Sequence, residues 1–439
     1  MTIDALGTVT GRRGLFDPVR ARASFPALRS DPARLDGAAG TQVPQSVIDA
    51  VTDAYLSGMA NVNGVFEGSR ECEQLIARAR GAVADLLGAR PEGVVLGPNM
   101  TTLTYHLANA LSRDWRPGDE VIVSRLDHDA NVRPWIQAAE RAGARIRWAE
   151  INVPTGELPA EQYESLVNDR TRLVAVAAAS NVLGAITDLP AIAAAAHRHG
   201  ALVYVDGVHA TPHLPIDMAA LGADFFATSA YKWFAPHIGA VAADPALLEQ
   251  LHPYKLAPAP ERVPDRFETG TPAFADLAGV AAAVDHIAGL DAAATGSRRE
   301  RVLASMAAVE EYEISEINYL LAGLAALPHV RLVGSPRRRT PTAFFTVDGV
   351  APRDVARHLA RCGVWVWSGH AYAWEVTGAL GIRESGGAVR AGLVHYNLRS
   401  ESDRLLTAVA DLRARRAVHS GRVAVGGRAA QKPDRRCTK

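Results

Sequence analysis

The sequence predicts an α/β protein in which a large domain, built around a mostly parallel seven-stranded sheet flanked by helices, is followed by a small α+β domain. The chain has 439 residues, 48% of them hydrophobic, which is enough to bury more than one domain core. Short apolar segments alternate with Ala-rich helical stretches over the first 290 or so residues. This alternation is typical of a sheet covered by helices on both faces.

The strands of the large sheet are predicted where short apolar runs are bounded by turn residues. Apolar residues at helical spacing from 74 to 87 and from 103 to 111 predict two of the flanking helices. The seven predicted strands are residues 93–97, 120–124, 145–151, 173–179, 201–206, 225–228 and 240–243.

The pattern changes after residue 291. A helical pattern covers residues 297–327, and strands of a smaller domain are predicted at 331–333, 343–347 and 364–367. We therefore predict four parts: an N-terminal segment (1–35) packing on the small domain, a large domain (36–291), a small domain (292–416) and a tail (417–439). The tail has few residues to bury and is predicted to be disordered.

Composition narrows the class of partner. Lys plus Arg and Asp plus Glu number 47 each, which argues against binding to nucleic acid or to an anionic membrane surface. No signal peptide or membrane anchor is recognisable, so a cytoplasmic protein with a small-molecule substrate is expected. Three scattered cysteines and fourteen histidines without H-E-x-x-H spacing predict no metal site, and the nucleotide-binding motifs GxxxxGK[ST] and GxGxxG are absent.

Two polar residues follow predicted buried strands. Asp206 ends the apolar run ALVYVD, and Lys232 lies in ATSAYKWFAPHIG directly after another strand. Taken alone, Asp206 is better explained as a helix N-cap or a loop residue. A lysine in an apolar pocket, however, has a lowered pKa and reacts with carbonyls, as a Schiff base with an aldehyde cofactor requires. Asp206 could then pair with the ring nitrogen of such a cofactor.

These segments resemble a known family. Asp206-Gly-Val-His209 and Ser229-Ala-Tyr-Lys232 are similar to the pyridoxal 5′-phosphate (PLP) site of class V aminotransferases and cysteine desulfurase-like enzymes, which are fold-type I PLP enzymes. Further matching segments in the same order are residues 35–40, 126–131, 180–184, 267–272 and 389–393. The resemblance implies that Lys232 holds PLP as an internal aldimine.

The resemblance also implies how the cofactor is held. His128 would stack on the PLP ring and move protons, Asn181 and His209 would lie beside the ring oxygen, and Asp206 would pair with the ring nitrogen. The turn of Asn99, Met100 and Thr101, together with Ser229, would bind the phosphate at a helix N-terminus. Thr271 resembles a residue that relatives lend to the neighbouring subunit, which implies a homodimer with shared active sites. Alternatives are a capping turn for Thr101 and a core position for His128.

The substrate would lie on the same side of the cofactor. Arg390 matches the arginine that grips the substrate α-carboxylate, with a surface arginine as the alternative. Ala39 lies in a segment that resembles the substrate loop, and Asn63 is expected to line the side-chain pocket.

The sequence departs from the desulfurases at one place. Where they carry a reactive loop cysteine, this chain has Tyr372, which we expect to act as an acid or base; Cys362, ten residues earlier, is predicted to be a packing residue. A C–S β-lyase acting on cysteine or a cysteine S-conjugate is therefore preferred, since that reaction needs no protein thiol. Transamination, racemisation and decarboxylation remain open. A non-catalytic scaffold would be expected to lose Lys232, Asp206 or Arg390, and all three are present.

Overall fold

The computed structural model describes residues 2–3, 9–10 and 16–420, and side chains up to 412. Its large domain contains a seven-stranded sheet in the order β4-β10-β9-β8-β7-β5-β6, and only β10 runs antiparallel to its neighbours. The strands are β4 (Val94–Gly97), β5 (Glu120–Ser124), β6 (Arg145–Ala149), β7 (Thr171–Ala177), β8 (Leu202–Asp206), β9 (Phe225–Ser229) and β10 (Gly239–Ala243). The predicted fold class is confirmed.

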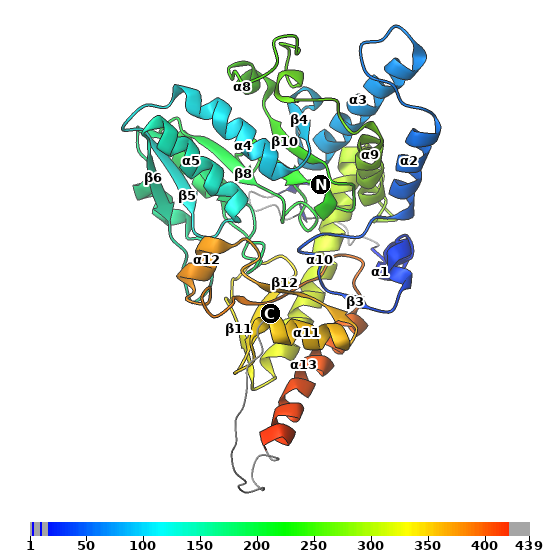
Figure 1. Cartoon of the computed structure of the whole chain (residues 1–439), viewed down its shortest axis with the longest axis vertical. Coiled ribbons are helices and arrows are strands. Elements are labelled where there is room, and N and C mark those ends of the chain that lie inside the picture. Colours follow the sequence, from blue (N-terminus) through cyan, green and yellow to red (C-terminus); the bar gives the residue numbers. More distant parts are fainter. Residues whose placement is uncertain (1, 4–8, 11–15, 421–439) are drawn as a thin grey trace, which may run out of the picture.

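Helices cover both faces of this sheet, as Figure 1 shows. Successive residues point to opposite faces, so Ile122 packs into one core while Val121 and Val123 pack into the other. Because both faces are buried, the central strands β8, β9 and β10 are mostly apolar, whereas the edge strand β6 (RIRWA) is more exposed and carries two arginines. One layer contains α2 (Gln45–Leu56), α3 (Glu67–Leu87), α7 (Leu189–His197), α9 (Phe274–Ala288) and the start of α10 (Arg298–Ala325); the other contains α4 (Met100–Leu111), α5 (Arg133–Ala142) and α8 (Pro245–Glu249).

The small domain is an antiparallel sheet in the order β11-β12-β15-β14, packed against helices. Its long helix α10 begins with a capping box, in which Ser297 and Glu300 satisfy each other's backbone N–H groups. The strands are β11 (Val330–Leu332), β12 (Thr342–Val347), β14 (Trp367–Gly369) and β15 (Ala388–Gly392), and the helices are α11 (Pro352–Arg361), α12 (Trp374–Ala379) and α13 (Arg399–Ser420). Strand β15, which carries Arg390, was not among the predicted strands.

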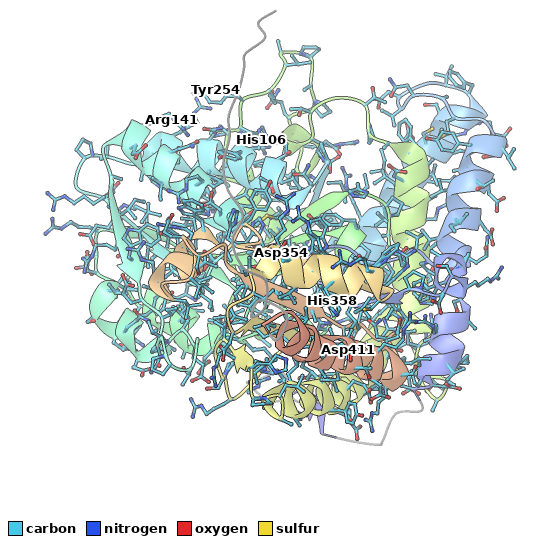
Figure 2. All side chains as sticks on the ribbon, turned by 60° about the horizontal axis from the view of Figure 1, so that its bottom comes forward. His106, Arg141, Tyr254, Asp354, His358 and Asp411 are labelled. Carbon is cyan, nitrogen blue, oxygen red and sulfur yellow. The ribbon has the colours of Figure 1, made fainter. Side chains whose placement is uncertain are left out.

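Helices α11 and α13 pack side by side at the lower end of the molecule. His358 on α11 is buried and makes a 2.9 Å hydrogen bond through Nε2 with the carbonyl oxygen of Ala408 on α13. Figure 2 shows His358 near Asp411 of α13. Cys362 follows α11 and is exposed, so the prediction that it packs in the core is wrong. The helix has ended at that point, and the turn toward Gly363 carries the thiol to the surface.

The segment before the large domain contacts both domains. Helix α1 (Pro18–Ala23) is capped by Asp17, and β3 (Ala33–Arg34) pairs in parallel with β13 (Val364–Trp365) of the small domain. Phe25, in contrast, packs against Phe234 of the large domain. The predicted domain boundaries stay a prediction.

At the other end, α13 continues to Ser420, so residues 417–420, which we predicted to belong to a disordered tail, are helical. The rest of that predicted tail lies outside the described residues. Among the helices that the structure describes, none combines the length and apolar character needed to cross a bilayer.

The remaining short elements are β1 (Thr2–Ile3), β2 (Val9–Thr10), α6 (Tyr163–Leu166), η1 (Pro26–Arg29), η2 (Pro91–Gly93), η3 (Ser112–Asp114), η4 (Asp129–Asn131), η5 (Ala160–Gln162), η6 (Ala230–Lys232) and η7 (Asp265–Phe267).

A close backbone contact fixes the start of α4 against the sheet. A Cβ atom on Gly239, the first residue of β10, would lie 2.3 Å from the carbonyl carbon of Asn99 and 2.6 Å from the amide nitrogen of Met100. These are backbone atoms, so they cannot rotate away. Glycine at position 239 therefore sets where α4 begins.

We expect Gly239→Ala to push α4 away from β10 and to destabilise the protein by about 1–3 kcal/mol, as overpacked sites do. Gly81→Ala is the matched control, because its new methyl group would meet only the flexible Arg298 side chain at 3.6 Å and lies inside a helix. Urea unfolding of both variants measures the difference. A Gly239→Ala protein that unfolds at the wild-type urea concentration would show that the contact is not restrictive.

Candidate active site

The carboxyl ends of adjacent parallel strands form the base of the candidate site. Asp206 ends β8, and its strand neighbours at that level are Ala177 on β7 and Ala227 on β9. Ser229 ends β9, and the helical turn with Lys232 follows at once. Ligands bind at this edge of open α/β sheets, because the strand ends and the loops after them converge there.

A cavity of about 750 Å³ opens at this edge, between the two domains. The small domain contributes Arg390 from β15 and the segment from Trp367 to Tyr372. The predicted site residues that line the cavity are Ala39, Met100, Thr101, His128, Asn181, Asp206, His209, Ser229, Lys232, Tyr372 and Arg390. Residues separated by up to 351 positions in the chain are thus brought together, from Ala39 to Arg390 (390 − 39 = 351).

Three predicted site residues do not line the cavity of their own chain. Asn99 is the N-cap of α4, where its side chain accepts a 2.9 Å hydrogen bond from the amide of Thr102. Asn63 is exposed on the loop before α3, and its amide donates to Glu73. Thr271 is exposed as well. The position of Asn63 gives no support to its predicted contact with substrate in the same chain.

The loop that carries Lys232 is held by residues 38–41 of the large domain. The amide and hydroxyl of Thr41 each donate to the carbonyl oxygen of Tyr231 at 3.0 Å, and the Thr41 hydroxyl accepts from the amide of Phe234. The Lys232 Nζ atom donates a 2.5 Å hydrogen bond to the carbonyl oxygen of Ala38. The lysine side chain is therefore directed into the cavity from a loop that is fixed on both sides of it.

The pKa of Lys232 is lowered to about 7. Burial is the main cause, the positive charge of Arg390 acts in the same direction, and the negative charge of Asp206 opposes both. Desolvation disfavours the charged ammonium, so a large fraction of the amine is neutral near neutral pH. A neutral amine is the form that attacks a carbonyl carbon. The pocket therefore prepares Lys232 for the chemistry that the sequence predicted.

Two buried carboxyl groups influence each other here: Asp206, which lines the cavity, and Asp127, which does not line it. Burial raises the pKa of Asp206 to about 6, although the amide of Val208, 3.0 Å from its Oδ1, and the charge of Lys232 act in the opposite direction. Burial likewise raises the pKa of Asp127 to about 7, and the Asp206 charge adds to this. Asp127 accepts hydrogen bonds from the Ser124 hydroxyl and from the Asn131 amide group. Sequence reasoning missed Asp127, although it too follows a buried strand.

His128 is neutral in this environment. Its Nδ1 accepts a 3.1 Å hydrogen bond from the Ala130 amide, so its proton is carried by Nε2. Burial, and then the charges of Lys232 and Arg390, lower its pKa to about 4. With its pKa this low, His128 carries little positive charge near pH 7, and its predicted part in moving protons stays a prediction. The flat, neutral ring remains suited to stacking.

Arg390 connects the small domain to the strand ends of the large one. It is buried, and its Nη1 donates a 2.9 Å hydrogen bond to the carbonyl oxygen of Asn181; burial lowers its pKa to about 10. The side chain of Asn181 donates to the carbonyl oxygen of Ala371, and in the described part of the chain its buried Oδ1 has no hydrogen-bond partner. Because Asn181 lines the cavity, its unpartnered amide oxygen is available to a donor on a ligand.

His209, which the sequence placed beside the ring oxygen, is directed partly elsewhere. Its Nε2 lies 3.0 Å from the Thr340 hydroxyl and 3.1 Å from the Thr342 hydroxyl, both from the small domain. Burial holds its pKa well below the usual range, so the ring is neutral. His209 therefore lines the cavity and also joins the two domains.

The part of the cavity lined by the start of α4 is suited to a phosphate group. The twelve-residue helix α4 begins there, and Met100 and Thr101 of its first turn line the cavity. The amide of Met100 donates a 3.0 Å hydrogen bond to the hydroxyl of Ser229, which holds the helix end at the tip of β9. Helix N-termini attract anions through their free N–H groups and the positive end of the helix dipole. With Lys232 and Asp206 between the two ends, the residues fit PLP.

Titration of the lysines tests this electrostatic description. The chain has only four lysines, Lys232, Lys255, Lys432 and Lys439, so ¹³C-methylated apoprotein gives few lysine signals. We expect one signal, that of Lys232, to titrate near pH 7 and to gain its neutral form as the pH rises through 7. That signal should be missing in Lys232→Ala. Four lysines with ordinary pKa values would contradict the described burial.

Comparison with known proteins agrees with this site. The sequence model of the family described as Aminotransferase class-V matches residues 33–405. An uncharacterized protein, MT3887, from Mycobacterium tuberculosis is 40% identical over 90% of this chain and 99% of its own length. A cysteine desulfurase from an Enterobacter species is 33% identical over 89% of this chain and 97% of its own length.

The fold agrees as well. The crystal structure of the cysteine desulfurase CsdA from Escherichia coli superposes with a TM-score of 0.79 at 28% identity, covering 92% of this chain and 99% of that one. The family uses PLP as its cofactor. The chain belongs to the class V aminotransferase family of fold-type I PLP-dependent enzymes, and within it resembles the cysteine desulfurases.

Proposed function

We propose that this enzyme is a C–S β-lyase that removes the sulfur substituent from cysteine or a cysteine S-conjugate. The observation that carries the proposal is the identity of the loop beside the cavity, which presents Tyr372 where desulfurases have their cysteine. No cysteine is found among the cavity-lining residues of the described chain, and Cys362 lies outside them. Sulfur transfer to a protein thiol therefore has no support, whereas elimination needs no thiol.

PLP bound through Lys232 would supply the electron sink that stabilises negative charge on the substrate α-carbon. The Lys232 amine, which is partly neutral near pH 7, can take the α-proton. Asp206 can accept a hydrogen bond from the ring nitrogen and favour its charged form. In the net reaction the Cα–H and Cβ–S bonds break, a Cα–Cβ double bond forms, and the sulfur leaves as a thiolate. Water then converts the remaining enamine to pyruvate and ammonia.

Arg390 and Tyr372 are the residues best placed to contact the substrate itself. The Arg390 guanidinium is a planar donor that can hold the α-carboxylate with two hydrogen bonds. The Tyr372 ring centre lies 5.5 Å from that of His128, on the open side of the cavity. The Tyr372 hydroxyl can give a proton to the departing sulfur, which lowers the barrier to C–S cleavage.

We also infer that the enzyme is a homodimer in which Thr271 completes the neighbouring site. Thr271 is exposed, yet the segment before it is fixed, because Glu268 accepts hydrogen bonds from Arg80 at 2.8 Å and from the amide of Leu96 at 2.8 Å. An exposed hydroxyl close to a fixed segment is suited to contact a phosphate across an interface. The family resemblance supports the same arrangement.

The reaction type is tested by product analysis. The purified holoenzyme is given cysteine, cystine, S-alkyl cysteines or alanine, and pyruvate, ammonia and thiol are measured. We expect equal amounts of pyruvate and ammonia from a cysteine derivative, with loss of this activity in Lys232→Ala and full retention in the control Lys255→Ala. A keto acid that keeps the substrate's carbon skeleton, with no released thiol, would instead identify an aminotransferase.

The shared site is tested by hybrid dimers. Thr271→Asp should place a carboxylate against the phosphate of the neighbouring site, and Lys232→Ala removes the reactive amine, so each variant alone should be nearly inactive. Mixed in equal amounts, they should recover about a quarter of the wild-type activity, because half of randomly paired dimers are hybrids with one complete site. Inactive hybrids, once their formation is verified by native mass spectrometry, would contradict the role of Thr271.

A further inference from the structure

The loop that carries Tyr372 has a costly backbone conformation. We call residues 370–373, between β14 and α12, the capping loop. Ala371 and Tyr372 are consecutive non-glycine residues with positive φ angles of 46° and 57°. Such left-handed residues cost free energy and persist only where surrounding contacts hold them. The capping loop must therefore be held by contacts outside itself.

Two hydrogen bonds from the large domain hold the backbone of the capping loop. The amide of Asp129 donates to the carbonyl oxygen of Tyr372 at 2.8 Å, and the side chain of Asn181 donates to the carbonyl oxygen of Ala371 at 2.9 Å. Both acceptors are the carbonyls of the two left-handed residues. The strained conformation is thus stabilised from the opposite side of the cavity.

A cluster of ion pairs holds the next turn of the chain. Glu375, in the first turn of α12, accepts a 2.5 Å hydrogen bond from Arg133 and a 2.6 Å hydrogen bond from Arg125, one on each carboxylate oxygen. Its side chain is only 13% exposed. Arg133 also pairs with Asp129 at 2.9 Å, and the Arg125 guanidinium lies 3.9 Å over the ring of Trp148. We call Arg125, Glu375 and Arg133 the carboxylate clamp.

The clamp and the backbone hydrogen bonds close into one ring of contacts. The Tyr372 carbonyl oxygen accepts from the Asp129 amide, and the Asp129 carboxylate pairs with Arg133. Arg133 in turn pairs with Glu375, which lies three residues after Tyr372 in the chain, so the contacts form a closed circuit. Arg125 and Arg133 lie on the large domain, just after β5 and at the start of α5. In Figure 1, α12 lies directly below this part of the large domain.

We propose that the carboxylate clamp keeps the capping loop closed and fixes the Tyr372 side chain beside His128, so that Glu375 is a positioning residue of the active site. The Tyr372 side chain is 68% exposed and has few contacts of its own, so its location depends on the backbone that carries it. The contribution of the clamp to catalysis rests on the proposed function of Tyr372. The effect of the clamp on the conformation of the capping loop is independent of that proposed function.

The test uses the full-length holoenzyme and three variants. Glu375→Gln removes the charge but keeps the shape, Glu375→Asp keeps the charge on a shorter side chain, and Asp354→Asn is the matched control. Asp354 forms an exposed ion pair with Arg357 on α11 and does not line the cavity. Circular dichroism confirms that each variant is folded. Hydrogen exchange of residues 369–376 reports loop opening, and the rate at which phenylhydrazine removes the absorbance of bound PLP reports access to the cavity.

We expect Glu375→Gln to increase both rates about tenfold or more, because two charged hydrogen bonds are lost, while Glu375→Asp shows a smaller increase and Asp354→Asn none. Unchanged hydrogen exchange in folded Glu375→Gln would show that the carboxylate clamp does not hold the capping loop closed. A wild-type protein without the absorbance of PLP bound to Lys232 would instead refute the proposed function, and hydrogen exchange would still decide on the clamp.

A double-mutant cycle tests the connection to Tyr372. Tyr372→Phe removes the hydroxyl and keeps the ring, so kcat should fall in this variant and in Glu375→Gln. If the clamp acts through Tyr372, the double variant should lose hardly more kcat than Tyr372→Phe alone. Losses that multiply in the double variant would show that Glu375 acts independently of Tyr372.

Discussion

Withdrawal of the Lys232 amine from water is the constraint around which the site is built. An ammonium group in this position would lack hydration and would face Arg390, so the lysine is held in equilibrium with its neutral form near pH 7. The same burial raises the pKa of the Asp206 carboxyl group. In water both groups would be fully charged near pH 7. In the site the charge of each group depends on the other and on a bound cofactor. Only a rigid sheet edge can keep them at this distance from solvent, which explains why both follow directly on buried strands.

Much of the fold and the centre of the site could be predicted because the signals are local. Continuous apolar runs mark the strands of a sheet buried on both faces, and a polar residue at the carboxyl end of such a run lies at the edge of the sheet where ligands bind. Asp206, Ser229 and Lys232 are identified in this way. The strand β15 was not predicted, since its centre carries Arg390, and a buried arginine interrupts the apolar pattern that marks a strand.

What could not be predicted depends on contacts between distant parts of the chain. The low pKa of His128 results partly from Arg390, 262 residues later (390 − 128 = 262), and a single side chain gives no sign of this. Glu375 contacts Arg125 and Arg133 across 250 and 242 residues, so nothing near it in the sequence distinguishes it from a solvated glutamate. The exposure of Cys362 depends on where α11 ends, which its apolar neighbours do not indicate.

The division of the cavity between two domains has a mechanical consequence. Its floor belongs to the large domain, whereas Arg390 and the capping loop belong to the small one. An amino acid that is bound at Lys232 and held by Arg390 would therefore act as a further link between two domains that otherwise meet through backbone hydrogen bonds and side-chain contacts. Occupancy of the cavity would then determine how cooperatively the two domains unfold. A substrate long enough to reach both Lys232 and Arg390 would raise the free energy of unfolding of the whole enzyme.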